Sequence, residues 1–171
     1  SINLKKLELE KERLSLDYLN SNGPQVVVEG GIIKRWNIEI NGSRIFLISK
    51  GEGSFDSSYD IDNRFKIDGS ILEVFNTLVA QSGGTIRARA RFYQNMFKED
   101  YEVEVVGTDL NISSDKLPTE ITSADFSLDY KDKWLKLERF SAKLSAGEIS
   151  AKGGVGLENL VPEVDLSLKF N

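Results

Sequence analysis

Alternation of apolar and polar residues over most of the chain is the feature that most limits its fold. The clearest case is residues 164–170, where Val, Leu, Leu and Phe alternate with Asp, Ser and Lys. Successive side chains of a β-strand point to opposite faces, so a period of two predicts strands with one apolar face. About eleven such segments occur between residues 1 and 171. The pattern predicts a mainly β, antiparallel chain that forms a single segment without a linker.

Several hairpins follow from the requirement that paired strands share an apolar face. Leu7 is expected opposite Leu16. The dipeptide 41–42, Asn-Gly, lies between alternating runs and predicts a type I′ turn, whose central residues both need a positive φ. Gly30-Gly31 is expected to break the ladder or to allow a bulge. Two weak strands are predicted at residues 55–61 and 64–67.

The hairpin around residues 86–105 is supported by both its apolar face and its charges. Its register places Arg89 opposite Glu104 and Arg91 opposite Glu102. Further along, the parity of the alternation changes between Leu137 and Phe140, which predicts a β-bulge near residues 138–139.

One segment departs from the strand pattern. Apolar residues recur at helical spacing between Ile71 and Val79, and Ser70 and Glu73 have the spacing of a capping box. Gly83 stands where such a helix would end. The sequence therefore predicts one helix over residues 71–81, packed against the sheet.

Composition excludes several classes of function. The chain has no cysteine and no histidine, so it has no disulfide, no Cys/His zinc site and no imidazole base. Its net charge of −5 argues against nucleic acid as a partner. No apolar run reaches the roughly 18 residues of a membrane helix. No pair of carboxylates stands out, so we expect no enzymatic activity and no cofactor.

Two charged clusters have a structural and a functional interpretation. Acidic residues gather between Asp56 and Asp68, but a calcium loop starting at Asp60 would have Arg64 and Phe65 at its fifth and sixth positions, so a solvated loop is favoured and no metal is expected. Arginines at 87, 89 and 91 could bind phosphate, but Glu102 and Glu104 are expected to neutralise two of them.

The apolar face is the main candidate site. It is predicted to consist of ten residues: Phe126, Leu128, Leu135, Leu137, Phe140, Leu144, Ile149, Leu157, Leu166 and Phe170. Alternation predicts equally the buried core of a sandwich or barrel and an open groove that holds lipid acyl chains. A third possibility is a scaffold or chaperone-like module that binds partner proteins by adding a strand to its sheet.

The C-terminal part resembles the AsmA-like superfamily, and within it the TamB family. The resemblance rests on residues 147–157, on the phrase that follows from Pro162 to Phe170, and on 27–36 with its Gly-Gly-Ile. It implies a β-taco, an elongated U-shaped sheet with an apolar interior. It also implies that the chain is a fragment of a long periplasmic protein anchored in the inner membrane. The final strand stops without a polar tail, which also favours a fragment.

By this resemblance, the chain would conduct phospholipid towards the outer membrane and support outer-membrane biogenesis. A TamA-like outer-membrane barrel protein would be a partner. The superfamily offers no catalytic residues to carry over.

Overall fold

The computed structural model describes residues 6–8, 15–18, 25–71, 81–95, 98–113, 120–156 and 163–170. In these ranges the chain is mainly β, as the alternation predicts. The strands are β1 (Lys6–Glu8), β2 (Ser15–Tyr18), β3 (Gln25–Glu29), β4 (Ile32–Gly42), β5 (Ile45–Ser54), β6 (Ser58–Asp68), β7 (Gln81–Asn95), β8 (Lys98–Ser113), β9 (Ile121–Lys131), β10 (Trp134–Leu144), β11 (Gly147–Gly156) and β12 (Glu163–Phe170). A single 3-10 turn, η1 (Gly69–Ile71), follows β6.

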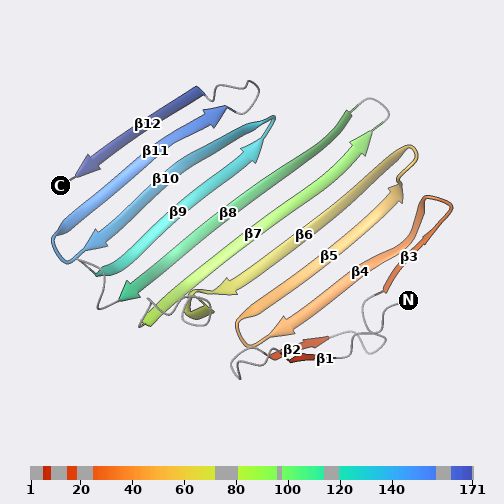
Figure 1. Cartoon of the computed structure of the whole chain (residues 1–171), viewed down its shortest axis with the longest axis horizontal. Coiled ribbons are helices and arrows are strands. Elements are labelled where there is room, and N and C mark those ends of the chain that lie inside the picture. The colour runs from red at the N-terminus through yellow and green to blue at the C-terminus, as the bar shows by residue number, and fades with distance from the viewer. Residues whose placement is uncertain are drawn as a thin grey trace. The chain divides into compact units, whose positions relative to one another are not determined.

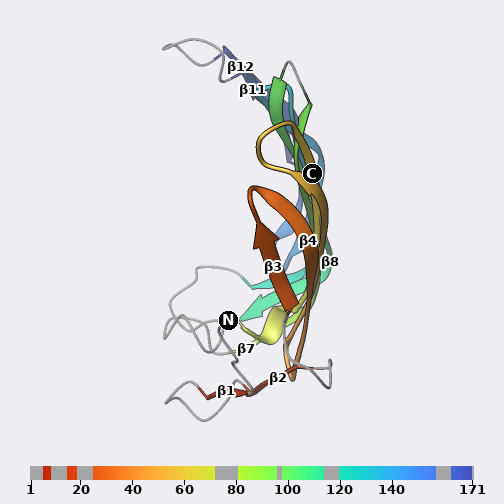
Figure 2. The same cartoon turned by 90° about the vertical axis from the view of Figure 1, so that its right-hand side faces the viewer.

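The strands follow one another as an antiparallel meander (Figure 1). They divide into two compact units: unit 1 contains Ser1–Lys66 and Arg89–Glu102, and unit 2 contains Ile67–Ala88 and Val103–Asn171. In unit 1 the order is β1-β2-β4-β5-β6-β7, with β3 paired to β4; in unit 2 it is β7-β8-β9-β10-β11-β12. Within each unit the strands form a single layer (Figure 2).

Several predicted pairings are confirmed. Leu7 lies opposite Leu16 in the pairing of β1 with β2. The register of β10 shifts between Leu137 and Phe140 against both of its neighbours, which is the bulge predicted at residues 138–139. Gly30 and Gly31, with φ of 53° and 76°, form the turn between β3 and β4. Both residues therefore need the left-handed conformation that glycine adopts without a Cβ clash.

The turn predicted at Asn41-Gly42 is wrong in position. Both residues belong to β4, neither has a positive φ, and the bend falls on Ser43 and Arg44. Asn41 is paired with Phe46, so the ladder continues past the residues that local propensity favours for the turn. The pairing of the apolar strands thus outweighs the turn preference of two residues.

Two other expectations about residues 55–83 change. The weak strands predicted at 55–61 and 64–67 are one strand, β6, preceded by a turn at Phe55–Ser57. The helix predicted over 71–81 lies outside the described residues except at its ends, where Ile71 closes η1 and Gln81 begins β7. Gly83, expected to end that helix, lies inside β7.

Burial is shallow throughout the described part of the chain. Its buried apolar residues are Ile33, Ile61, Ala124 and Ala142, and no described side chain is fully buried. A sandwich or closed barrel places a layer of large, fully buried side chains between its walls. The described residues of each unit lack that layer. None of the described helical structure is long and apolar enough to cross a membrane.

Candidate functional site

The register of unit 2 places most of the predicted site on one face of the sheet. Residues directly opposite each other in an antiparallel pair have side chains on the same side. Leu137 lies between Leu128 on β9 and Gly153 on β11, and Phe140 lies between Phe126 and Ala151. We call this side the apolar face. Its described residues are Val103, Val105, Gly107, Leu110, Ile112, Ile121, Ala124, Phe126, Leu128, Tyr130, Leu135, Leu137, Phe140, Ala142, Leu144, Ile149, Ala151, Gly153 and Val155.

The bulge in β10 is what keeps this face continuous. Leu135 and Leu137 are odd-numbered, whereas Phe140 and Leu144 are even-numbered, so an uninterrupted strand would send the two sets to opposite faces. The extra residue between Leu137 and Phe140 restores the parity. The apolar face therefore depends on a local irregularity.

Three of the ten predicted site residues have side chains that the structure does not describe. Leu157 lies outside the described residues. Leu166 and Phe170 are strand positions of β12 that lie opposite Gly153 and Ile149. Their pairing is the one that the face requires. The other seven predicted residues, whose side chains are described, are all half-buried.

Strand β8 adds residues to the apolar face that the alternation did not single out. Leu110 and Ile112 lie opposite Ala124 and Ile121 on β9. A register shift after Gly107, where Asp109 has a φ of 51°, changes the parity of the strand. As in β10, the apolar positions change from odd to even numbers. In the sequence this change is hard to see, because the polar residues 108–109 separate the two sets.

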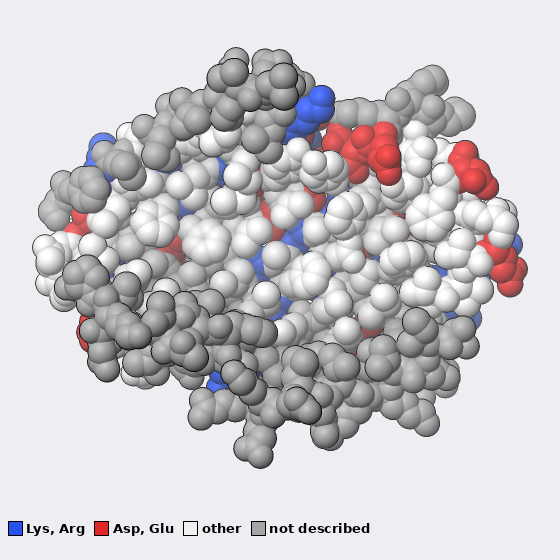
Figure 3. Space-filling model, in the orientation of Figure 1, with Lys and Arg blue, Asp and Glu red and all other residues white. Residues whose placement is uncertain are grey.

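The surface of the apolar face is shaped by glycine and alanine. A Cβ at Gly107 would lie 2.3 Å from Cε1 of Phe126, so this ring lies across the neighbouring strand. On β11, Ala151 and Gly153 stand beside the large side chains of β10. In the view of Figure 3, uncharged side chains make up most of the visible surface, and charged ones show at its margins and in small patches between the uncharged ones.

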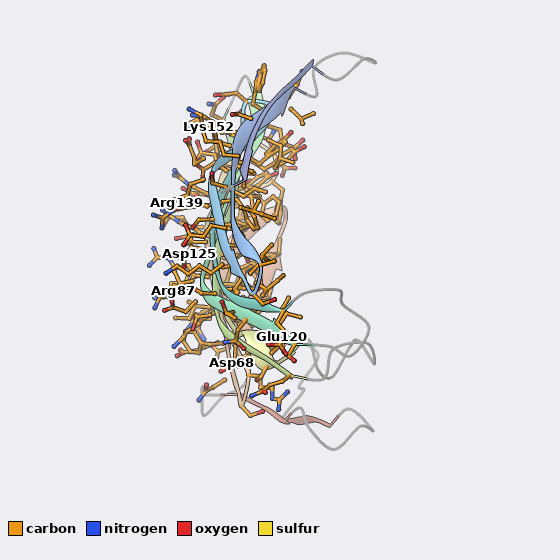
Figure 4. The ribbon with its side chains drawn as sticks, turned by 90° about the vertical axis from the view of Figure 1, so that its left-hand side faces the viewer. Asp68, Arg87, Glu120, Asp125, Arg139 and Lys152 are labelled. Carbon is orange, nitrogen blue, oxygen red and sulfur yellow. The ribbon has the colours of Figure 1, made fainter. Side chains whose placement is uncertain are left out.

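The opposite face of unit 2 is polar. Arg87, Asp125, Arg139 and Lys152 extend to the same side of the ribbon (Figure 4). Lys136 forms an ion pair with Glu138 at 2.7 Å, and this hydrogen bond raises the pKa of the lysine. The ring of Trp134 lies beside Gly154 and Gly156 at the edge of a hollow of about 510 Å³.

Unit 1 carries a chain of polar contacts that the alternation did not predict. The Nε1–H of Trp36 donates to Ser49 Oγ at 2.8 Å, and Ser49 Oγ–H donates to Asn63 Oδ1 at 2.6 Å. The Asn63 amide then donates to the carbonyl of Ala90 at 3.1 Å. The chain joins β4, β5, β6 and β7. Ser49 is only 3% exposed, and its hydroxyl is satisfied by these partners.

The arginines of β7 bind carboxylates that the sequence analysis did not assign to them. Arg89 Nε donates to Asp62 at 2.9 Å, and Arg91 Nε donates to Asp60 at 2.9 Å. Hydrogen bonds from Arg89, aided by Arg64, hold the pKa of Asp62 below its ordinary value. Asp60, with a smaller contribution from Glu102, raises the pKa of Arg91.

These contacts add two carboxylates of β6 to the glutamates, Glu102 and Glu104, that the sequence predicts as partners. β7 has a neighbour on each side, and carboxylates of β6 hold the guanidinium groups of Arg89 and Arg91. The pairing of Arg89 with Glu104 stays a prediction. Two of the acidic residues considered for calcium are thus engaged with arginines, and a third, Asp68, accepts a hydrogen bond from the backbone N–H of Ser70. Among the described residues no group of acidic side chains has the arrangement of a metal site.

Comparison with known proteins adds no relative to this picture. The sequence matches no protein-family model, and neither the curated proteins nor the solved structures contain a significant match.

Proposed function

We propose that the apolar face of unit 2 binds the acyl chains of phospholipids. The observation that carries the proposal is the row-by-row pairing of Leu, Ile, Val, Phe and Ala over β8 to β11, with the described side chains mostly half-buried. Soluble monomers seldom keep a large apolar patch without a ligand, a partner or a membrane. Burying this surface against hydrocarbon would contribute about 25 cal/mol per Å² of apolar area.

A passive conduit is the mode of action that we propose. The apolar face of unit 2 is built from hydrocarbon side chains at adjacent positions, so an acyl chain would meet similar surroundings from strand to strand. Shallow binding of this kind favours movement over tight retention. The charged groups of the opposite face would stay in water.

The resemblance to the AsmA-like superfamily supports a wider proposal. In it, the sheet is a segment of a U-shaped β-taco in a periplasmic protein that bridges the inner and outer membranes. Phospholipid would pass along the groove, and a TamA-like barrel protein would be the outer-membrane partner. The role is one of transport rather than catalysis, without a cofactor.

Photo-crosslinking tests the proposal on purified protein. A photoreactive amino acid is placed at Leu137 on the apolar face or at Lys136, its neighbour on the polar face, and the chain is exposed to phosphatidylethanolamine vesicles. We expect lipid adducts from position 137 and few from 136, because successive side chains of β10 point to opposite faces. Equal labelling of both positions, or none at 137, would reject the lipid face.

Charged substitutions separate binding from folding. Leu137→Asp should abolish crosslinking by a probe at Phe140 while the chain still unfolds cooperatively, because the half-buried side chain can reach water. Lys152→Asp is the matched control on the polar face, where Ser167 lies opposite. Loss of folding in Leu137→Asp together with no adducts in the parent would favour a packed core.

A further inference from the structure

Strand β3 exposes apolar side chains on both of its faces. Val26, Val27 and Val28 are 42%, 40% and 41% exposed. An ordinary half-buried strand alternates between covered and exposed positions, so three successive exposed valines are unusual. The strand also lacks the Lys or Pro residues that commonly protect an edge.

The outer side of β3 is a sheet edge. β3 pairs with β4 and lies off the main strand order of the sheet, so among the described strands no second neighbour covers it. Backbone groups of an antiparallel strand point alternately towards and away from the partner. Among the described residues, β4 is the one strand that pairs with Gln25–Glu29, so the N–H and C=O groups that point to the outer side have no strand partner in that part of the chain.

This edge is complementary to itself. If a second copy pairs antiparallel about a twofold axis at Val27, then Val26 meets the other copy's Val28 and Gln25 meets the other copy's Glu29. All five residues of the strand are used. Any other centre shortens the pairing or brings Gly30 of the turn into it. A twofold axis of this kind makes the same strand both donor and acceptor of the contact.

Charge favours the same register. Gln25 Oε1 accepts a hydrogen bond from Arg35 Nη1 on β4. The partner's Glu29 would therefore approach a glutamine and an arginine, and no two like charges lie opposite each other. Cross-strand valine pairs and opposite charges stabilise a sheet, whereas like charges destabilise it.

We propose that two copies of this chain associate through β3, joined antiparallel about Val27 into one continuous sheet. Main-chain hydrogen bonds supply the attraction in this mode, and the valines on both faces supply the specificity. The contact is separate from the apolar face of unit 2, so it does not depend on the proposed lipid binding.

A single cysteine tests the geometry. The chain has no native cysteine, so Val27→Cys creates one thiol per molecule. Opposed residues of an antiparallel pair have Cα atoms about 4.5–5.5 Å apart, within the range of a disulfide. We expect Val27→Cys to form a disulfide dimer under mild oxidation. Ile32→Cys, at a site 45% exposed on β4, is the control, because it lies one strand away from the edge. Equal crosslinking of both variants would overturn the proposal.

A charge exchange tests the register. In Val26→Lys/Val28→Lys, each introduced lysine meets a lysine of the other copy, so sedimentation equilibrium should show monomers. In Val26→Lys/Val28→Glu, each introduced lysine meets a glutamate, so the dimer should be retained. A double-lysine variant that stays dimeric would overturn the proposal. A parent chain that is monomeric at every concentration would also overturn it. In that case a strand of a different protein would be the candidate partner of the edge.

Discussion

Ser49 shows how much one small polar residue can determine in a sheet that buries little. Its hydroxyl receives the indole N–H of Trp36 and donates to Asn63, so three strands are joined through one oxygen atom. In the sequence, Ser49 occupies an apolar-phase position after Leu47 and looks like a weak interruption. Alternation indicates on which face of the sheet a side chain lies, but it contains no information about hydrogen bonds between side chains of neighbouring strands.

Removal of this hydroxyl should destabilise unit 1. Ser49→Ala leaves the Trp36 N–H and the Asn63 carbonyl without their partner, which should lower the free energy of unfolding by about 1–3 kcal/mol. Ser43→Ala, in the exposed turn after β4, is the control and should change it by less than about 0.5 kcal/mol. Urea unfolding measures both. Equal values for the two variants would show that the polar chain contributes nothing.

The ion pair of Arg89 with Asp62 should make stability depend on pH. The folded-state pKa of Asp62 is lowered by Arg89, so the stabilisation is present above the unfolded-state pKa, about 3.9, and is lost as pH falls through the folded-state value. The side chain of Arg89 is 50% exposed and that of Asp62 is 23% exposed, so solvent screens the pair, and Arg89→Gln should cost only about 0.2–1 kcal/mol near neutral pH.

That cost should disappear in acid. Unfolding of the parent, Arg89→Gln and the control Arg87→Gln is compared from neutral pH down to below the Asp62 pKa. The parent and Arg89→Gln curves should converge at the acidic end. A gap that keeps its size in acid would mean that Arg89 stabilises the fold by packing rather than by charge.

At the level of strands, alternation predicted which residues share a face, but for the arginines of β7 it considered only one of the two neighbouring strands. The parity change between Leu137 and Phe140 located the bulge in β10, because a buried or half-buried face tolerates no slip. For Arg89 and Arg91 the sequence predicted partners only on the strand that follows. An inner strand has a neighbour on each side, and its sequence does not show which of the two supplies the carboxylates. Asn41-Gly42 failed for a related reason: a turn preference is local, whereas the ladder through Ile40 and Leu47 is cooperative.

The corrected turn has a direct consequence for substitutions. Asn41 is an exposed strand residue, so Asn41→Thr should leave stability unchanged or raise it by up to about 0.5 kcal/mol. Gly30 has a φ of 53°, so Gly30→Thr should lower stability by about 1 kcal/mol or more. Thermal unfolding of the two variants decides the matter. If Asn41→Thr lowered stability and Gly30→Thr did not, the type I′ turn would lie at Asn41-Gly42 after all.

For the molecule as a whole, the net charge of −5 limits how it can meet lipid. Binding through acyl chains depends on apolar burial, which salt hardly weakens, while repulsion from anionic head groups is screened as ionic strength rises. Two arginines of β7 are held by carboxylates, Arg89 by Asp62 and Arg91 by Asp60, which reduces their attraction for phosphate.

Lipid binding should therefore respond to salt in a particular direction. Association with zwitterionic micelles should change little between about 0.05 and about 0.5 M salt, and association with anionic micelles should increase. Fluorescence anisotropy of the labelled chain follows both titrations. Binding to anionic micelles that falls steeply with salt would instead indicate phosphate contacts by basic residues.

The two tryptophans give each unit its own optical reporter. Trp36 belongs to unit 1, where its N–H is hydrogen-bonded to Ser49, and Trp134 belongs to unit 2, where it is 40% exposed. Since the chain contains no other tryptophan, Trp134→Phe leaves emission from unit 1 alone, and Trp36→Phe leaves emission from unit 2 alone. Quenching by acrylamide and shifts of the emission maximum can then assign each unfolding step, and each lipid titration, to one half of the sheet.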